Sequence, residues 1–205
     1  MNQIYELNLW GGGNSDFYSG NGSHKSEIIT PYLKALTSFL EVHQPSLTVC
    51  DLGCGDFNIG KQLVPYTKKY IAIDIVDNLI NRNKKLYKSS NLEFLCLDIS
   101  QDELPPADCI ILRQVLQHLS NKEIVKVIEK VIAYKYIFLT EHIPLGDFTP
   151  NKDIITGQGI RLKQNSGINI LKAPFNLKIK SEKRLGVYLA EDCKSQIVTM
   201  LYELF

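Results

Sequence analysis

Three aspartates, Asp51, Asp74 and Asp98, each follow a short apolar run in the first half of the chain. Gly53 and Gly55 follow the first of them, and glycines in such a turn let the backbone approach a ligand closely. In a doubly wound α/β sheet, the carboxyl ends of the strands form the ligand-binding edge. The pattern therefore predicts a nucleoside pocket at that edge, where Asp74 accepts a pair of ribose hydroxyls.

The kind of nucleoside is indicated by departures from the dinucleotide-binding turn, Gly-x-Gly-x-x-Gly. Asn58 occupies the third glycine position, and Gly60 comes two residues late. In addition, the carboxylate of Asp51 would repel a pyrophosphate. A pocket flanked by aspartates suits a ligand that carries positive charge and free hydroxyls. S-adenosylmethionine, with its sulfonium, amine and ribose diol, is such a ligand.

Apolar runs alternate with helical periodicity through the middle of the chain, which predicts an α/β fold with a parallel sheet and right-handed crossovers. Helices are expected over residues 23–43, 59–66, 76–87 and 115–132. Strands are expected over residues 47–51, 70–74, 92–97, 108–112, 136–140, 185–190 and 196–204. Pro31 is expected in the first turn of its helix or at a break. Ser120 and Glu123 are expected to form a capping box inside the last helix.

The chain length suits a single domain over residues 1–205, built from four parts. Residues 1–45 are expected to form an N-terminal cap of loop and helix, and residues 46–140 the cofactor-binding core. Residues 141–180 carry glycines and prolines without helical periodicity, and a structureless run of this length indicates a substrate loop. Residues 181–205 are predicted to close the sheet as a β-hairpin.

The composition is that of an ordinary soluble globule, with 44% apolar and 22% charged residues. The formal net charge of +1 does not favour a nucleic-acid partner. No apolar run is long enough to span a bilayer, and the N-terminus lacks the features of a signal peptide, so no membrane association is expected. The five cysteines are dispersed and lack metal-ligand spacing, which predicts reduced thiols, a cytoplasmic location and no metal site.

Four segments, in this order, resemble the motifs of the class I S-adenosylmethionine-dependent methyltransferases. Residues 49–55 resemble the first motif of that family, and residues 72–75 resemble the acidic end of its second strand. Residues 97–99 resemble its adenine-contacting loop, and residues 108–119 resemble its fourth strand with the following helix. The resemblance implies a Rossmann-like sheet of seven mostly parallel strands in the order 3-2-1-4-5-7-6, the last one antiparallel. It also implies S-adenosyl-L-methionine as methyl donor and S-adenosyl-L-homocysteine as product.

The resemblance further implies which residues contact the cofactor. The backbone around Asp51, Gly53, Cys54 and Gly55 would hold the methionine moiety, and Asp74 would accept both ribose hydroxyls. The other implied contacts are Ile75 packing on adenine, Asp98 accepting the adenine amine with Ile99 beside it, and Gln114 facing the cofactor from the end of strand four.

The N-terminal residues 8–23 contain five glycines interleaved with aromatic residues. In one interpretation Tyr18 and Ser23 fold over the cofactor, with backbone N–H groups near its carboxylate. In the other, this segment is a flexible terminus.

Three residues near the expected ligand-binding edge could act as a general base, namely His118, Glu141 and His142. His118 falls where this family often has a histidine. For each of the three, a packing or structural role is the alternative interpretation. An oxygen nucleophile would need one of them nearby, whereas a nitrogen nucleophile with an available lone pair needs little help from a base.

The substrate side is less defined by the sequence, because the usual helix between strands five and six is not evident. Arg113 could bind a carboxylate of substrate or cofactor, or could form a structural ion pair. Asn151 and Arg161 could line a substrate lid, or could lie in a solvated loop.

These observations favour an enzyme that transfers a methyl group to a nitrogen or oxygen atom of a small-molecule acceptor. A nucleic-acid or protein methyltransferase is the first alternative, since two basic clusters, at residues 82–88 and 178–184, could follow a phosphate backbone. However, no Asn/Asp-Pro-Pro-Tyr/Phe follows strand four, which disfavours enzymes that methylate planar amines. A non-catalytic S-adenosylmethionine-binding protein is the second alternative.

Overall fold

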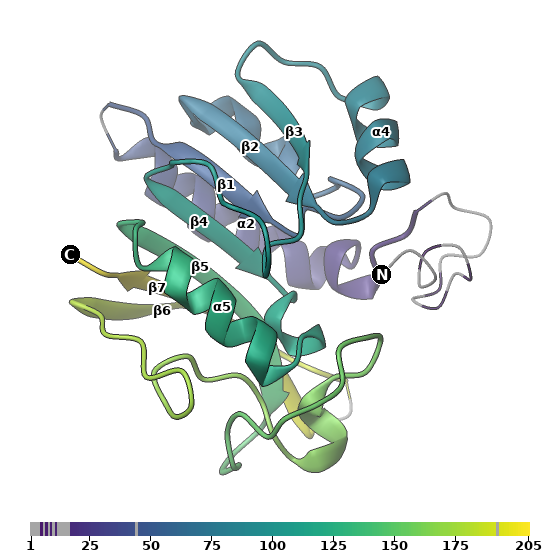
Figure 1. Cartoon of the computed structure of the whole chain (residues 1–205), viewed down its shortest axis with the longest axis vertical. Helices are drawn as coiled ribbons and strands as arrows, with labels where there is room; N and C mark the ends of the chain where they lie inside the picture. Colours follow the sequence, from purple (N-terminus) through teal and green to yellow (C-terminus); the bar gives the residue numbers. More distant parts are fainter. Residues whose placement is uncertain are drawn as a thin grey trace. The chain divides into compact units, whose positions relative to one another are not determined.

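The computed structural model describes residues 5, 7, 9, 11, 17–43, 45–191 and 193–205. Its strands form one sheet in the order β3-β2-β1-β4-β5-β7-β6, in which β7 runs antiparallel to β5 and β6 (Figure 1). The predicted α/β class and strand order are confirmed. The chain divides into two compact units, Met1–Cys109 and Ile110–Phe205, whose boundary falls within β4 (Cys109–Arg113).

The first unit contains three neighbouring parallel strands, β1 (Thr48–Leu52), β2 (Lys69–Asp74) and β3 (Leu92–Cys96). Its helices are η1 (Asn21–Ser23), α2 (Ser26–Glu41), α3 (Gly60–Leu63), η2 (Val64–Tyr66) and α4 (Asp77–Leu86). Every residue of β2 after Lys69 is buried, as is typical of a parallel strand covered on both faces. The helix α4 covers one of these faces and lies along β2 and β3 (Figure 1).

The register of these strands brings their carboxyl ends to one edge. Asp51 of β1 lies opposite Ala72 of β2, and Asp74 at the end of β2 lies opposite Cys96 of β3. The turn that follows β1 is consequently a neighbour of Asp74, as the spacing predicted.

The helix α2 buries Ile28, Tyr32, Leu36 and Leu40, which recur at helical spacing along one face. Pro31 lies in the interior of this helix and on its exposed side. The expectation that Pro31 marks a first turn or a break is wrong, because the helix continues through it. The proline removes one backbone donor on the solvent side only, while the apolar face keeps the helix packed.

Gly60 makes room for an aromatic ring. A Cβ atom at Gly60 would lie 2.3 Å from Cε2 of Phe57. The ring of Phe57 is fully buried and makes edge contacts with Tyr70, Tyr87 and Phe94, so it has no space to move away. This packing explains why a glycine stands at position 60 even though it is not the third glycine of a dinucleotide-binding turn.

The second unit holds the strands β5 (Tyr136–Pro144), β6 (Ser181–Leu189) and β7 (Ser195–Glu203), with η3 (Leu116–His118), α5 (Asn121–Val131) and η4 (Arg161–Gln164). The predicted C-terminal hairpin is present, since β6 and β7 pair antiparallel. β5 pairs with β7 from Tyr136 to Pro144 and is longer than expected. Glu141 and His142 therefore lie inside this strand rather than after it.

The single helix expected over residues 115–132 is interrupted. The chain forms the short turn η3, becomes extended at Leu119 and Ser120, and then enters α5. Ser120 caps α5 as predicted, because its side chain accepts from the N–H of Glu123 while the Glu123 side chain accepts from the N–H of Ser120. The extended backbone of a residue that caps a helix explains the break.

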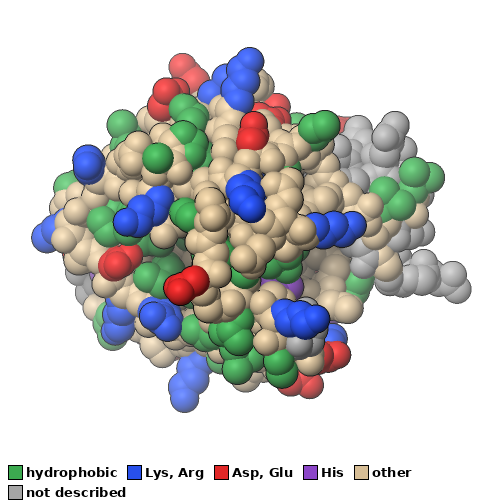
Figure 2. Space-filling view, turned by 90° about the horizontal axis from the view of Figure 1, so that it is seen from below, with side chains coloured by type: hydrophobic (Ala, Val, Ile, Leu, Met, Phe, Trp, Pro, Cys, Tyr) green, Lys and Arg blue, Asp and Glu red, His purple; other side chains and the backbone are tan. Residues whose placement is uncertain are grey.

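Charged side chains of both signs are mixed on one face of the molecule. Figure 2 shows Lys and Arg side chains interspersed with Asp, Glu and apolar groups on the face that it presents. Among the helices of the described residues, none has the length and apolar character that crossing a membrane requires.

Candidate active site

The turn after β1 is held open by two glycines and anchored to β2. Gly53 has a φ of 86° and Gly55 a φ of 54°, backbone conformations that glycine adopts without steric cost. The N–H groups of Gly53 and Cys54 both donate to the carbonyl of Ile73, at 2.8 and 2.9 Å. The turn therefore has a fixed position at the carboxyl ends of β1 and β2. We call residues 53–58 the glycine turn.

Asp74 connects the end of β2 to the glycine turn. Its Oδ2 accepts from the N–H of Gly55 and its Oδ1 from the N–H of Val76, both at 3.1 Å. Burial raises the pKa of Asp74, and the bonds from Val76 and Gly55 oppose that rise. An ionised carboxylate offers about four lone-pair sites. Gly55, Val76 and the backbone of Ile75 use up to three of these sites, so Asp74 keeps the capacity to accept at least one further hydroxyl donor.

Asp51 is buried and accepts from the hydroxyl of Tyr70 at 2.8 Å. Burial, followed by the charge of Asp51, raises the pKa of Tyr70, so this hydroxyl stays a donor at neutral pH. Burial also raises the pKa of Cys54, with Asp74 and Asp51 adding to the effect. The glycine turn thus lies between two buried carboxylates, with a protonated thiol at its centre, and the local field favours a positively charged ligand.

Asp98 follows β3, and its Oδ1 accepts from both the N–H and the hydroxyl of Ser100, at 2.8 and 2.7 Å. Since both of these bonds use Oδ1, Oδ2 is suited to accept an adenine amine. Ile99 is buried beside it, whereas Ile75 is 45% exposed at the end of β2. An exposed isoleucine at this edge fits the predicted packing on adenine.

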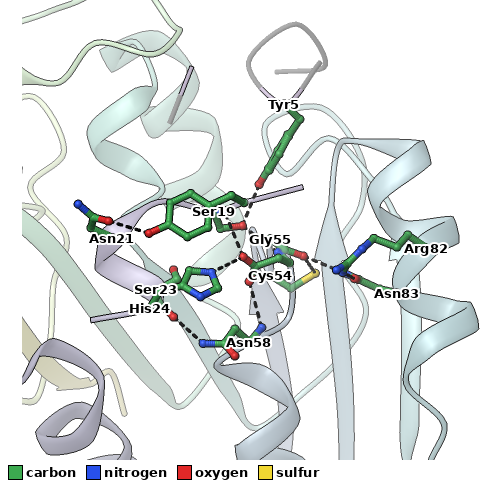
Figure 3. A network of polar contacts seen from close by, with 12 residues as sticks. Tyr5, Ser19, Asn21, Ser23, His24, Cys54, Gly55, Asn58, Arg82 and Asn83 are labelled. Carbon is green, nitrogen blue, oxygen red and sulfur yellow. Dashed lines mark hydrogen bonds and ion pairs between the residues drawn. The ribbon is translucent and has the colours of Figure 1, made fainter. Parts of the chain in front are cut away.

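Tyr18 and Ser23 lie in a segment that contacts the glycine turn. The carbonyl of Ser23 accepts from Nδ2 of Asn58 at 2.7 Å, and the ring of Tyr18 stacks on His24. Figure 3 shows Ser19, Ser23 and His24 gathered beside Gly55 and Asn58. Residues 17–24 are thus bound to the glycine turn, while contact of Tyr18 and Ser23 with the cofactor stays a prediction. Most of residues 8–16 lie outside the described part of the chain.

The second unit contains the remaining predicted residues. Gln114, directly after β4, has a φ of 57°, which is uncommon for any residue but glycine, and its N–H donates to the carbonyl of Thr140 at 2.7 Å. Its side-chain Oε1 accepts from Arg113 Nη1 at 3.5 Å. A constrained backbone at a strand end is common at ligand sites and supports the predicted role of Gln114, which stays a prediction.

Glu141 holds the turn η3 in place. Its two carboxylate oxygens accept from the N–H groups of Leu116 and Gln117, at 3.2 and 3.0 Å. Burial raises the pKa of Glu141 to about 8, opposed by these two bonds and by the charge of Arg161. The carboxyl group is thus occupied by the backbone, which favours a structural role over that of a general base.

The raised pKa of Glu141 makes the stability of the protein depend on pH. Between its ordinary value of 4.5 and about 8, the folded protein holds a proton that the unfolded chain has lost. The free energy of unfolding is therefore expected to fall as pH rises through this range, by at most about 1.4 kcal/mol per pH unit. Urea unfolding between pH 5 and 8 measures this effect, and the unchanged protein should lose stability more steeply with rising pH than Glu141→Gln does, since the shifted pKa values of Asp74 and His118 act in both proteins.

The exposed Glu129 of the same unit provides the matched control, since Glu129→Gln should leave the slope as it is. A Glu141→Gln profile with the same pH dependence as the unchanged protein would contradict the assignment of the proton to Glu141.

His118 and His142 also have structural partners. His118 Nδ1 lies 3.2 Å from the carbonyl of Gly157, so Nδ1 carries the hydrogen, and Nε2 faces the amide Nε2 of Gln117 at 3.3 Å. Burial lowers the pKa of His118, which keeps the ring neutral. His142 Nε2 lies 2.9 Å from the hydroxyl of Ser195. Their catalytic assignment stays a prediction, and these contacts favour a positioning role.

Arg161 is 1% exposed and lies in the loop between β5 and β6, where its side chain connects several segments by hydrogen bonds. Its guanidinium donates five hydrogen bonds, to Asn121 Oδ1 and to the carbonyls of Lys152, Leu116, Gln117 and Leu119. Asn151 similarly donates to the carbonyls of Asn169 and Ala173 and accepts from the N–H of Asn169. Both side chains hold the loop together, which favours a structural role over direct substrate binding.

Residues 49–134, from β1 beyond the end of α5, match the family described as methyltransferase domain. The solved N-methyltransferase NodS from Bradyrhizobium japonicum WM9, in complex with S-adenosyl-l-homocysteine, has the same fold, with a TM-score of 0.68 and 12% identity over 99% of each chain. Residues 49–134 are thus similar to a methyltransferase domain, and the chain has the fold of this solved N-methyltransferase.

Two further proteins are similar to this chain. Phosphoethanolamine N-methyltransferase 1 from Arabidopsis thaliana is 30% identical over 105 residues, which are 46% of this chain. The match spans only 21% of that relative's length. Magnesium protoporphyrin IX methyltransferase (ChlM) from Synechocystis PCC 6803, solved with bound SAM, has a TM-score of 0.57 at 16% identity, covering 98% of this chain and 93% of that one.

Several residues of the candidate site were not singled out from the sequence. Asn83 is fully buried on α4 and donates to the carbonyl of Gly55 at 2.8 Å. Its signal was available, because Asn83 lies at helical spacing from the buried Leu79 and Ile80. Asp56 of the glycine turn also contacts Ser19 and His24, but no local sequence pattern predicts these contacts. In the described part of the chain, no group of three or more metal-ligating side chains occurs.

Proposed function

We propose that this chain is an S-adenosyl-L-methionine-dependent methyltransferase that acts on a small-molecule acceptor, with nitrogen as the favoured acceptor atom. The observation that supports this most is the hydrogen bond from Gly55 to Asp74. It joins the glycine turn, which approaches the methionine part of such a ligand, to the carboxylate that accepts its ribose hydroxyls. Asp98 and Ile75 are suited to the adenine ring at the same edge of the first unit.

The buried carboxylates fit the charge of this methyl donor. Asp51 and Asp74 favour a sulfonium and an amine near the glycine turn, and they disfavour a pyrophosphate. The bound donor supplies a methyl group that is already activated by the sulfonium. The protein therefore needs mainly to align the acceptor and to exclude water.

A nitrogen acceptor is favoured because each candidate base is engaged elsewhere. Both oxygens of Glu141 accept from backbone N–H groups, and both ring nitrogens of His118 have neighbours in hydrogen-bond range. An amine with a free lone pair can attack without a base, whereas a hydroxyl needs one. NodS and the Arabidopsis relative are both N-methyltransferases, which agrees with this preference.

A small acceptor is favoured over a polymer by the surface charge. On the face shown in Figure 2, the basic side chains do not form a continuous stripe of the kind that follows a phosphate backbone. The net charge of +1 points in the same direction. The nucleic-acid or protein methyltransferase is accordingly the second candidate.

Calorimetric titration tests the cofactor, and labelled methyl transfer tests the acceptor. S-adenosyl-L-homocysteine is expected to give a heat of binding, while nicotinamide dinucleotides give none. With methyl-labelled donor, matched amines and alcohols of the same carbon skeleton should be compared, and the amines are expected to accept the label. Absence of cofactor binding would overturn the proposal. Binding without transfer to amines, alcohols, RNA or protein would support the non-catalytic alternative.

A further inference from the structure

A hydrogen-bonded cluster attaches residues 17–24 to the glycine turn. The N–H of Ser19 donates to Oδ2 of Asp56 at 2.9 Å, and the N–H of Asp56 donates back to Oγ of Ser19 at 2.8 Å. Nε2 of His24 lies 2.6 Å from the same Oδ2 and, facing a carboxylate, carries the hydrogen. The two segments are 37 residues apart in the sequence but exchange bonds in both directions.

The cluster is anchored by a buried charge. Asp56 is 6% exposed, and besides Ser19 and His24 it accepts from the N–H of Asn58 at its other oxygen, 3.1 Å away. A buried carboxylate is expensive to leave without donors. The side chain of His24 is 33% exposed and is held in place by Tyr18, whose ring stacks on it at 4.5 Å. His24 therefore supplies a side-chain donor that Asp56 needs.

The cluster lies in direct contact with the part of the turn that bonds Asp74. A Cβ atom at Gly55 would lie 2.4 Å from Oγ of Ser19, so the segment sits against the backbone of Gly55. The hydroxyl of Ser19 also lies 3.2 Å from that of Tyr5 (Figure 3). Gly55 in turn donates to Asp74. A displacement of the segment would consequently disturb the turn and its bond to the ribose-binding carboxylate.

We propose that His24 and Asp56 form a positioning pair for the cofactor. Their contact holds residues 17–24 against the glycine turn and so keeps Gly55 in the place where it bonds Asp74. The pair does not touch the reacting atoms; it acts through the turn. This inference rests on the proposed binding of S-adenosyl-L-homocysteine at the turn.

Three histidine variants test the pair. His24→Phe keeps a ring that can stack on Tyr18 but removes the N–H. In calorimetry it should weaken the binding of S-adenosyl-L-homocysteine about tenfold, which corresponds to a loss of about 1.4 kcal/mol of binding free energy. His24→Gln keeps an N–H at a similar reach and should restore most of the affinity. His43→Phe is the matched control, because His43 stacks on Phe39 away from the turn, and it should bind as the unchanged protein does.

A readout that separates positioning from stability is required. The melting temperature without ligand should change little in His24→Phe, because release of the segment lets water solvate Asp56. Trypsin cleavage after Lys25 should become faster for the same reason. In the unchanged protein, S-adenosyl-L-homocysteine should slow hydrogen exchange at the amides of Ser19 and Asp56. The hydrogen-exchange measurement needs no variant, so it tests the pair even if His24→Phe fails to fold.

The outcomes distinguish this inference from the proposed function. If the unchanged protein does not bind S-adenosyl-L-homocysteine, the proposed function fails. If it binds, but His24→Phe binds equally well or the amides of Ser19 and Asp56 exchange at the same rate with and without ligand, the positioning pair is wrong and the function stands.

Discussion

Arg161→Met is expected to remove about 3–5 kcal/mol from the free energy of unfolding, the scale of a buried charged group that loses its network. The five oxygens that accept from the guanidinium would lose their donor, and four of them are backbone carbonyls at η3 and in the loop. Urea unfolding measures the loss. Hydrogen exchange at the amides of residues 116–121 should show that it begins around η3.

The exposed Arg184 on β6 is the matched control, and Arg184→Met should change the free energy of unfolding by no more than about 0.5 kcal/mol. Arg161→Lys should be intermediate, because one ammonium group cannot reach all five acceptors. An Arg161→Met protein as stable as the control variant would mean that the hydrogen bonds of this side chain contribute little, and Arg161 would again be a candidate for substrate binding.

Asp74→Ala is expected to weaken the binding of S-adenosyl-L-homocysteine by about 1.5–3 kcal/mol, the scale of hydrogen bonds to a charged group. Calorimetry measures the change. Asp77→Ala is the control, since Asp77 is the exposed first residue of α4, and its carboxylate accepts from the side chain of Asn81. An affinity that is the same in both variants would remove the ribose assignment.

Loss of affinity in Asp74→Ala could also arise from the glycine turn, because Asp74 accepts from Gly55. The 2′-deoxyribose analogue of S-adenosyl-L-homocysteine separates the two effects. The unchanged protein should prefer the natural ligand over this analogue, whereas Asp74→Ala should bind both equally. A preference that survives in the variant would show that Asp74 supports the turn without contacting the ribose.

The strands β1 and β2 were predictable because each is a short, mostly apolar run in which every residue after the first is buried. The aspartates that end these runs mark the carboxyl edge of the sheet, so the glycine turn and Asp74 could be located from spacing alone. The capping box at Ser120 and Glu123 is a local pattern and was equally accessible. Features that depend on neighbours in the sequence are therefore the ones that sequence analysis finds.

The contacts of the loop and of the N-terminal segment could not be predicted, since their partners are distant in the chain. Arg161 has the appearance of a solvated loop cation, yet it is among the most buried side chains, 40–45 residues from its acceptors around η3. Asp56 and His24 lie 32 residues apart and follow no motif. The extension of β5 to Pro144 likewise depends on pairing with β7, which the composition of residues 141–144 does not indicate.

The loop between β5 and β6 has two anchored sides and an exposed tip. Asn151 and Arg161 fix its two sides, while Ile155 between them is 93% exposed and contributes almost nothing to the core. Mutational libraries directed at residue 155 should therefore retain folded protein in nearly every member, whereas libraries directed at 151 or 161 should be depleted. Sequence changes at this tip are therefore tolerated where changes at the two anchoring residues are not.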